Sequence, residues 1–61
     1  MTREEALELM LNSINEDNRE FCKMASIPDE EAESQIAQSQ PTLQVIVSNM
    51  YDRMKAASII A

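Results

Sequence analysis

Residues that are apolar with one exception recur at helical spacing in two separate stretches of the chain. This pattern limits the fold more than any other feature. In each stretch they follow one another at intervals of four, three, four, three and four, which places them along one side of an α-helix. The first set is Leu7, Leu11, Ile14, Asn18, Phe21 and Ala25, and the second is Leu43, Val47, Met50, Met54, Ala57 and Ala61. Only Asn18 is polar, so the spacing predicts two amphipathic helices and an all-α fold.

Two prolines, Pro28 and Pro41, divide the chain and predict three helices. The first covers about 3–25 and begins with a Thr2/Glu5 capping box, in which each side chain bonds the other residue's backbone N–H. The second, at about 28–38, is short; it opens with three acids, which the positive end of the helix dipole favours. The third covers about 41–60. We therefore expect one small domain over 1–61, a helical hairpin of two longer helices joined by a short acidic helix or linker.

Two places leave alternatives open. Residues 13–18 are mostly helix-capping types, so the first helix either continues through them or kinks near Asn15 and restarts with Ser13 or Asn15 as its cap. The absence of Gly and Pro there favours the continuous helix. Asn18 is either buried, where it would set the register of a helix pair, or partly exposed on a curved helix. Residues 43–47 are compatible with a short strand, but no turn and no second strand accompany them.

The chain is too short to bury a large core. It has 61 residues and one cysteine, so no intramolecular disulfide can staple it, and domains of this size gain little net stability from one core. The two apolar stripes exceed what one hairpin can cover, which predicts dimerisation into an assembly like a four-helix bundle. The residues expected at the partner or oligomer interface are Leu7, Leu11, Ile14, Phe21, Leu43, Val47, Met50, Tyr51 and Met54.

The residue types present exclude most catalytic machinery. The chain has no His, no Gly and one Cys, so it lacks Ser-His and Cys-His pairs, His-ligated metals and glycine loops for phosphates. The carboxylates at 29–33 lack the spacing of a calcium loop and are expected to be a solvated first turn. Cys22 is expected to be a packing residue rather than a redox group. We expect no enzyme activity, no cofactor and no metal.

The charge of the chain restricts its partners. Lys and Arg number 5 against 11 Asp and Glu, a net charge of −6, which argues against direct binding to nucleic acid or to an anionic membrane. The single cysteine favours a reducing, cytoplasmic setting. The first residues carry no signal-peptide pattern, and no stretch approaches the ~18 apolar residues of a membrane span. No internal repeat is evident.

Three functions remain. The favoured one is a homo-oligomer that binds and regulates or inhibits another protein through apolar helix surfaces. The second is an acidic decoy, which imitates nucleic-acid phosphates toward a nucleic-acid-binding protein. Its carboxylates would be Glu16, Asp17, Glu20, Asp29, Glu30, Glu31 and Glu33. The third is an oligomer that sequesters a small anionic ligand such as a nucleotide, with Tyr51, Arg53 and Lys55 as contacts.

Overall fold

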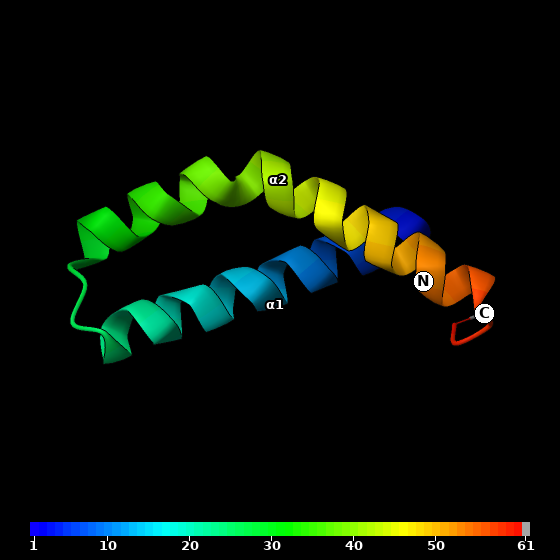
Figure 1. The fold of residues 1–61 in the computed structure, drawn as a ribbon, viewed down its shortest axis with the longest axis horizontal. Helices are drawn as coiled ribbons and strands as arrows, with labels where there is room; N and C mark the ends of the chain where they lie inside the picture. The colour runs from blue at the N-terminus through cyan, green and yellow to red at the C-terminus, as the bar shows by residue number, and fades with distance from the viewer. Residues whose placement is uncertain (61) are drawn as a thin grey trace.

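The computed structural model describes residues 1–60, which form an antiparallel hairpin of two α-helices (Figure 1). Helix α1 covers Arg3–Met24, helix α2 covers Asp29–Ala56, and residues 25–28 connect them. The strand alternative for residues 43–47 is wrong, because these residues lie inside α2. Ala61, the last member of the second apolar set, lies outside the described residues. The all-α hairpin is thus the observed architecture.

The N-terminus of α1 carries the predicted capping box. The Glu5 backbone N–H donates to the Thr2 hydroxyl oxygen at 3.2 Å, and the Thr2 N–H donates to the Glu5 carboxylate at 3.4 Å. The helix then continues through residues 13–18 without a break. Ser13 does not cap a new helix; its hydroxyl donates to the carbonyl of Leu9 at 2.9 Å. The continuous alternative is therefore the one observed.

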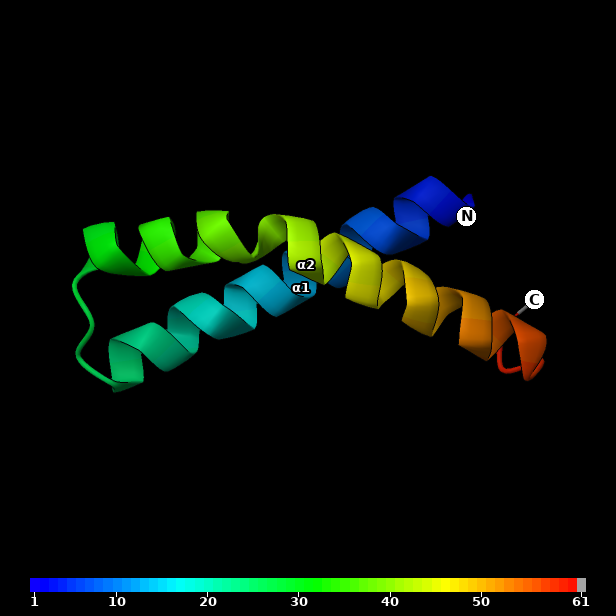
Figure 2. The same cartoon turned by 45° about the horizontal axis from the view of Figure 1, so that its top comes forward.

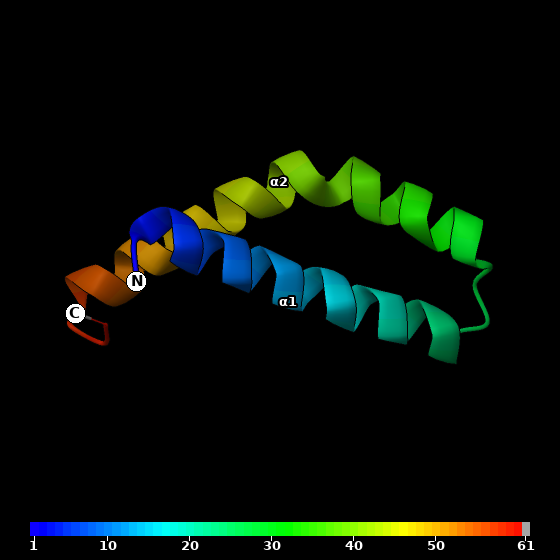
Figure 3. The same cartoon turned by 180° about the vertical axis from the view of Figure 1, so that it is seen from behind.

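The predicted break at Pro41 is wrong, because α2 runs through this residue and ends at Ala56 rather than near residue 60. The acidic segment predicted as a separate helix or linker forms the first turns of α2. Proline has no N–H, so the carbonyl of Ala37 loses its helical donor, which ordinarily costs about 3 kcal/mol inside a helix. Ala37 and Pro41 are both exposed, so water reaches this side of the helix. Helix α2 is bowed, as Figures 1 and 3 show, and proline is a regular cause of such bends.

Packing on both sides of Pro41 keeps α2 continuous. The buried hydrophobic residues among 1–60 are Cys22, Ala32, Ile36, Val47 and Tyr51, and Val47 is the most completely buried at 1% exposure. Ala32 and Ile36 precede the proline, whereas Val47 and Tyr51 follow it. A break at Pro41 would free one of these pairs from α1, and we infer that their burial outweighs the lost backbone hydrogen bond.

The side of α1 that meets α2 includes half-buried members of the predicted stripe, among them Leu7 and Leu11, but its two buried residues lie outside the stripe. The hairpin buries Asn15 and Cys22, the residues that follow Ile14 and Phe21, and Phe21 itself is 66% exposed. Asn18 is half-buried, so Asn15 and not Asn18 is the buried polar residue of α1. The predicted packing role of Cys22 is confirmed, since its thiol is free and buried.

Both helices end in the same way. After α1, the Ser26 N–H donates to the Lys23 carbonyl and the Ile27 N–H to the Cys22 carbonyl; after α2, Ser58 and Ile59 repeat these bonds. This is the Schellman motif, which usually places glycine at the left-handed position. Here Ser26 and Ser58 occupy it with φ of 59° and 58°. The sequence Lys-x-Ala-Ser-Ile accompanies both motifs, at 23–27 and 55–59, so the chain does contain a short internal repeat.

The hairpin is elongated and its helices cross. Its extents are 40 × 19 × 17 Å, and both termini lie at the end opposite the connection (Figure 1). Figure 2 shows the last part of α2 crossing the first part of α1 instead of running beside it. Neither helix, within residues 1–60, combines the length and the apolar character that crossing a membrane requires.

Candidate interaction surface

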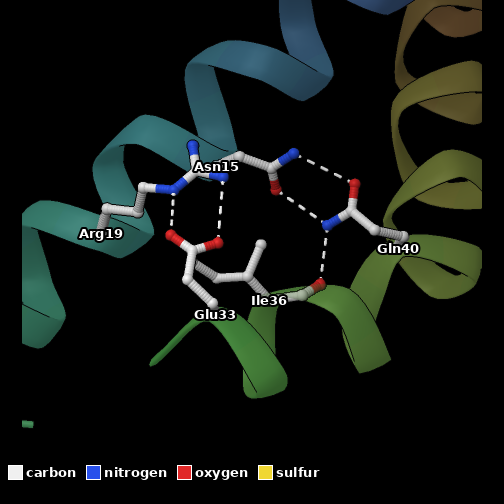
Figure 4. A network of polar contacts seen from close by, with 5 residues as sticks. All are labelled: Asn15, Arg19, Glu33, Ile36 and Gln40. Atoms are coloured by element: carbon white, nitrogen blue, oxygen red, sulfur yellow. Dashed lines mark hydrogen bonds and ion pairs between the residues drawn. The ribbon is translucent and has the colours of Figure 1, made fainter. Parts of the chain in front are cut away.

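A pair of amide side chains joins the helices at their centre (Figure 4). The Asn15 amide donates to the Gln40 side-chain oxygen at 3.0 Å, and the Gln40 amide donates back to the Asn15 oxygen at 3.0 Å. Gln40 also donates to the Ile36 carbonyl at 2.7 Å, one turn earlier in α2. Asn15 is only 9% exposed, so the pair meets the demand that buried polar groups be hydrogen-bonded. Its fixed geometry specifies which residues of α1 and α2 face each other.

Two exposed ion pairs lie on either side of this amide pair. Arg19 donates to both carboxylate oxygens of Glu33, at 2.7 and 3.3 Å, and Arg3 does the same to Asp52 at 3.2 Å. The Arg3 guanidinium also lies over the Tyr51 ring, 6.0 Å from its centroid. The ion pairs add orientation more than stability, because water screens them.

The Arg19–Glu33 pair makes part of the stability depend on pH. The hydrogen bond from Arg19, and then its charge, hold the pKa of Glu33 below its ordinary value of 4.5. The unfolded chain therefore binds a proton at Glu33 more readily than the folded chain does. The contribution of the ion pair to the free energy of unfolding is present above the ordinary pKa and is lost as pH falls through the lowered pKa of the folded state. We expect acid to destabilise the wild type more than Glu33→Gln, measured as the change in urea midpoint between neutral and acidic pH. Glu30→Gln is the control and should lose as much as the wild type; equal losses for Glu33→Gln would contradict the prediction.

The residues predicted at an interface lie in three environments. Val47 and Tyr51 are buried between the helices of this chain, so they hold the hairpin together. Phe21 and Met50 are exposed, at 66% and 43%. The remaining members are half-buried and are Leu7, Leu11, Ile14, Leu43 and Met54. Further large apolar side chains are exposed and are Met1, Leu9, Met24, Val45, Ile46 and Ile59.

Positions beside the buried residues divide the hairpin into two unlike faces. Each of the six buried residues has one neighbour before it in the sequence and one after it. The buried residues are Asn15, Cys22, Ala32, Ile36, Val47 and Tyr51. The neighbours before them are Ile14, Phe21, Glu31, Gln35, Ile46 and Met50. The residues one step after are Glu16, Lys23, Glu33, Ala37, Ser48 and Asp52. One step turns a helix by about 100°. Because the helices are antiparallel, the same sense of turn leads to the same side of the hairpin on both wherever they run side by side. In the terminal half, where the helices cross, the sides no longer match: Asp52 pairs with Arg3, which lies on the same side of α1 as Ile14.

Large apolar side chains gather on only one of these sides. We call the set Ile14, Phe21, Ile46 and Met50 the apolar face, and the set Glu16, Lys23, Glu33, Ser48 and Asp52 the polar face. Glu31 and Gln35 hold the remaining positions of the first side, and Ala37 holds the remaining position of the second. The sequence stripe did not reveal this division, because it cannot tell which of two adjacent apolar residues, such as Phe21 and Cys22, is buried.

Two hollows near the connection support the division. One, of about 250 Å³, has Phe21 of α1 and Gln35 of α2 in its lining, both from positions before a buried residue. The other, of about 220 Å³, has Lys23 and Glu33 in its lining, both from positions after one. Side chains that helix geometry assigns to one side therefore do meet there.

The residues considered for an anionic ligand do not converge within one chain. Tyr51 is buried beneath Arg3, whereas Arg53 and Lys55 are exposed. Two steps along a helix turn it by about 200°, so Arg53 lies on nearly the opposite side of α2 from Tyr51 and Lys55. Within residues 1–60 no group of three carboxylates or thiols is placed to hold a metal ion.

Comparisons with protein-family models, with curated proteins and with solved structures gave no match for this chain.

Proposed function

We propose that this protein is a non-enzymatic, self-associating helical module that binds and thereby regulates or inhibits a partner protein. The observation that carries the proposal is the apolar face, with Phe21, Ile46 and Met50 each more than 40% exposed on a chain of this size. Large apolar side chains exposed in this number on a small protein favour its association with another protein surface. Aromatic residues and methionine are also enriched where proteins meet.

Self-association is part of the proposal because the hairpin has a thin core. Five hydrophobic residues are buried among residues 1–60, and one of them is an alanine. Small domains without disulfides commonly gain the missing apolar contacts from another copy or another protein. A module of this kind acts by covering a surface of its partner protein, which regulates or inhibits the function of that surface.

The test compares apolar contacts with carboxylates as the basis of partner binding. The protein is immobilised, a lysate of its source cells is passed over it, and the retained proteins are identified at low and at moderate salt. We expect Met50→Ala to lose most of the specific retention, because buried anchors carry much of the affinity at interfaces. The loss follows whether Met50 touches the partner or joins the copies that present the binding surface.

The control variant removes charge instead. With Glu30, Glu31 and Glu33 all changed to Gln, retention should be nearly unchanged and should depend little on salt. Exposed charges are screened over about 10 Å at 0.1 M salt, so a decoy of nucleic acid would instead lose its partner steeply as salt rises. Loss of binding in the Gln variant together with that salt dependence would overturn the proposal in favour of the decoy.

A further inference from the structure

A groove of about 470 Å³ lies between the helices in the terminal half of the hairpin, where α2 crosses α1 (Figure 2). Helix α1 contributes Leu7 and Leu11 to its lining, and α2 contributes Val47 together with Gln44 and Ser48. The two leucines are half-buried, so part of each side chain is accessible from the groove. Val47 is almost fully buried and closes the groove at its base. The groove therefore offers apolar surface between polar side chains.

Two carboxylates border this groove without an opposite charge. Glu4 and Glu8 line it from α1, are exposed, and take part in no ion pair within residues 1–60. Among the described residues that line the groove, the only cation is Arg3, which already donates to both carboxylate oxygens of Asp52. The helix dipole favours an acid in the first turn, at Glu4, but its effect does not extend to Glu8. The groove therefore combines apolar surface with two unmatched negative charges.

The spacing of these carboxylates matches the cations of a helix. Glu4 and Glu8 are four residues apart, so they lie on one side of α1 about 6 Å apart along its axis. Two Lys or Arg side chains one turn apart on a second helix have the same spacing. An amphipathic helix that lays its apolar side in a groove is a common means by which proteins recognise each other.

We propose that the groove binds a basic amphipathic helix of the partner protein. The apolar side of that helix packs on Leu7 and Leu11, and two of its Lys or Arg side chains, one turn apart, pair with Glu4 and Glu8. Exposed charges of this kind set orientation and encounter rate more than affinity, so the affinity depends only modestly on salt. This inference rests on the proposed function and adds the chemistry of the partner.

The occupant is a different protein rather than a second copy, because the cations of this chain do not have the required spacing. Arg3 and Arg19 are held in ion pairs. The remaining cations are Lys23, Arg53 and Lys55, and no two of them are four residues apart. The apolar face stays free when the groove is occupied. Met50 of that face and Ser48 of the groove are two residues apart in α2, a turn of about 200°.

The test uses a synthetic peptide of about 18 residues, a length that can form a helix. It has leucines along one side, two lysines one turn apart beside them, and alanine and glutamine elsewhere. Fluorescence anisotropy of the labelled peptide measures the dissociation constant. We expect Glu8→Lys to weaken binding by roughly tenfold, because a repulsion of similar size replaces an attraction. Glu20→Lys is the control, since Glu20 is exposed on the same helix, pairs with no cation within residues 1–60, and changes the net charge equally. It should stay within about twofold of the wild type.

An exchange of charges covers the case in which a substitution only perturbs the fold. The variant with lysine at both Glu4 and Glu8 is tested with a second peptide, in which glutamates replace both lysines. This exchanged pair should bind within about threefold of the original pair, because the same attraction is restored. Each mismatched combination should be weaker by at least the tenfold expected above.

Amide shifts in NMR spectra of the wild type locate the peptide. We expect changes at residues 4–11 and 44–48 and none near the connection. Equal binding by Glu8→Lys and Glu20→Lys, changes centred on Phe21 and Met50 instead, or no binding at ~1 mM peptide would each overturn the groove as the partner site. Groove amides that shift with protein concentration alone would overturn it in favour of a second copy. Failure of the proposed function is distinguishable, because it appears as lysate retention that Met50→Ala leaves unchanged.

Discussion

Val47→Asp should unfold the hairpin. Val47 is 1% exposed and lies beside Leu7 and Leu11 of α1, so an aspartate there would bury a carboxylate without a partner. An unpaired buried polar or charged group costs several kcal/mol unless it is neutralised, and the lost valine contacts add about 1–2 kcal/mol. A domain of this size has a total stability of about 3–5 kcal/mol, so the change exceeds what the fold can tolerate.

The matched control for this prediction is Val45→Asp, two residues earlier in the same helix. Val45 is 59% exposed, so the same change of residue type leaves the new carboxylate in water. We expect its stability to remain within about 0.5 kcal/mol of the wild type. Thermal unfolding followed by circular dichroism at 222 nm measures both variants. Equal melting curves for the two variants would show that the described burial of α2 is wrong.

The Asn15–Gln40 pair gives the second large effect, which appears as non-additivity. Asn15→Leu leaves the Gln40 side-chain oxygen without its donor, while the Gln40 amide N–H keeps its bond to the Ile36 carbonyl. Gln40→Leu removes both partners of the Asn15 amide, which is 9% exposed. Each single change should destabilise the hairpin by about 1–3 kcal/mol. The double variant, with leucine at both positions, should be close to the wild type, because two apolar side chains leave no orphaned amide.

Urea unfolding of the wild type, the two single variants and the double variant gives the coupling energy of the amide pair. Asn12→Leu is the control, since Asn12 is an exposed asparagine of the same helix and its change should be nearly neutral. Additive effects of the two single changes would contradict the described pairing. The double variant should also lose register specificity, as buried amide pairs fix register in other helical assemblies.

The features that could be predicted from the sequence are those determined by neighbouring residues. The capping box depends on Thr2 and Glu5 alone, and the helical spacing needs no knowledge of the partner helix. The Ser26 and Ser58 helix ends were equally local and could have been found from their repeated Lys-x-Ala-Ser-Ile sequence. Proline and glycine usually mark helix ends. This chain has no glycine, and serine occupies the left-handed position where glycine would be recognised.

The features that could not be predicted depend on contacts between the helices. Continuity through Pro41 follows from packing on both sides of the proline, which overrides the local preference to stop. The phase of α1 follows from Asn15, a polar residue that no hydrophobic pattern would select, and its partner Gln40 is polar as well. The division into two faces follows in turn from that phase. The candidate surface could therefore be predicted only as a set of apolar residues, without the side on which they lie.

The antiparallel pairing also orders the folding of this chain. The contacts Arg19–Glu33, Asn15–Gln40 and Arg3–Asp52 span 14, 25 and 49 residues of sequence. Loop-closure entropy makes the longest of these about 1 kcal/mol harder to form than the shortest, so closure starts at the connection and proceeds toward the termini. Val47, the most buried side chain, lies in the half that closes last. The terminal half is therefore held by the packing of Val47 and Tyr51 rather than by an early, short loop closure.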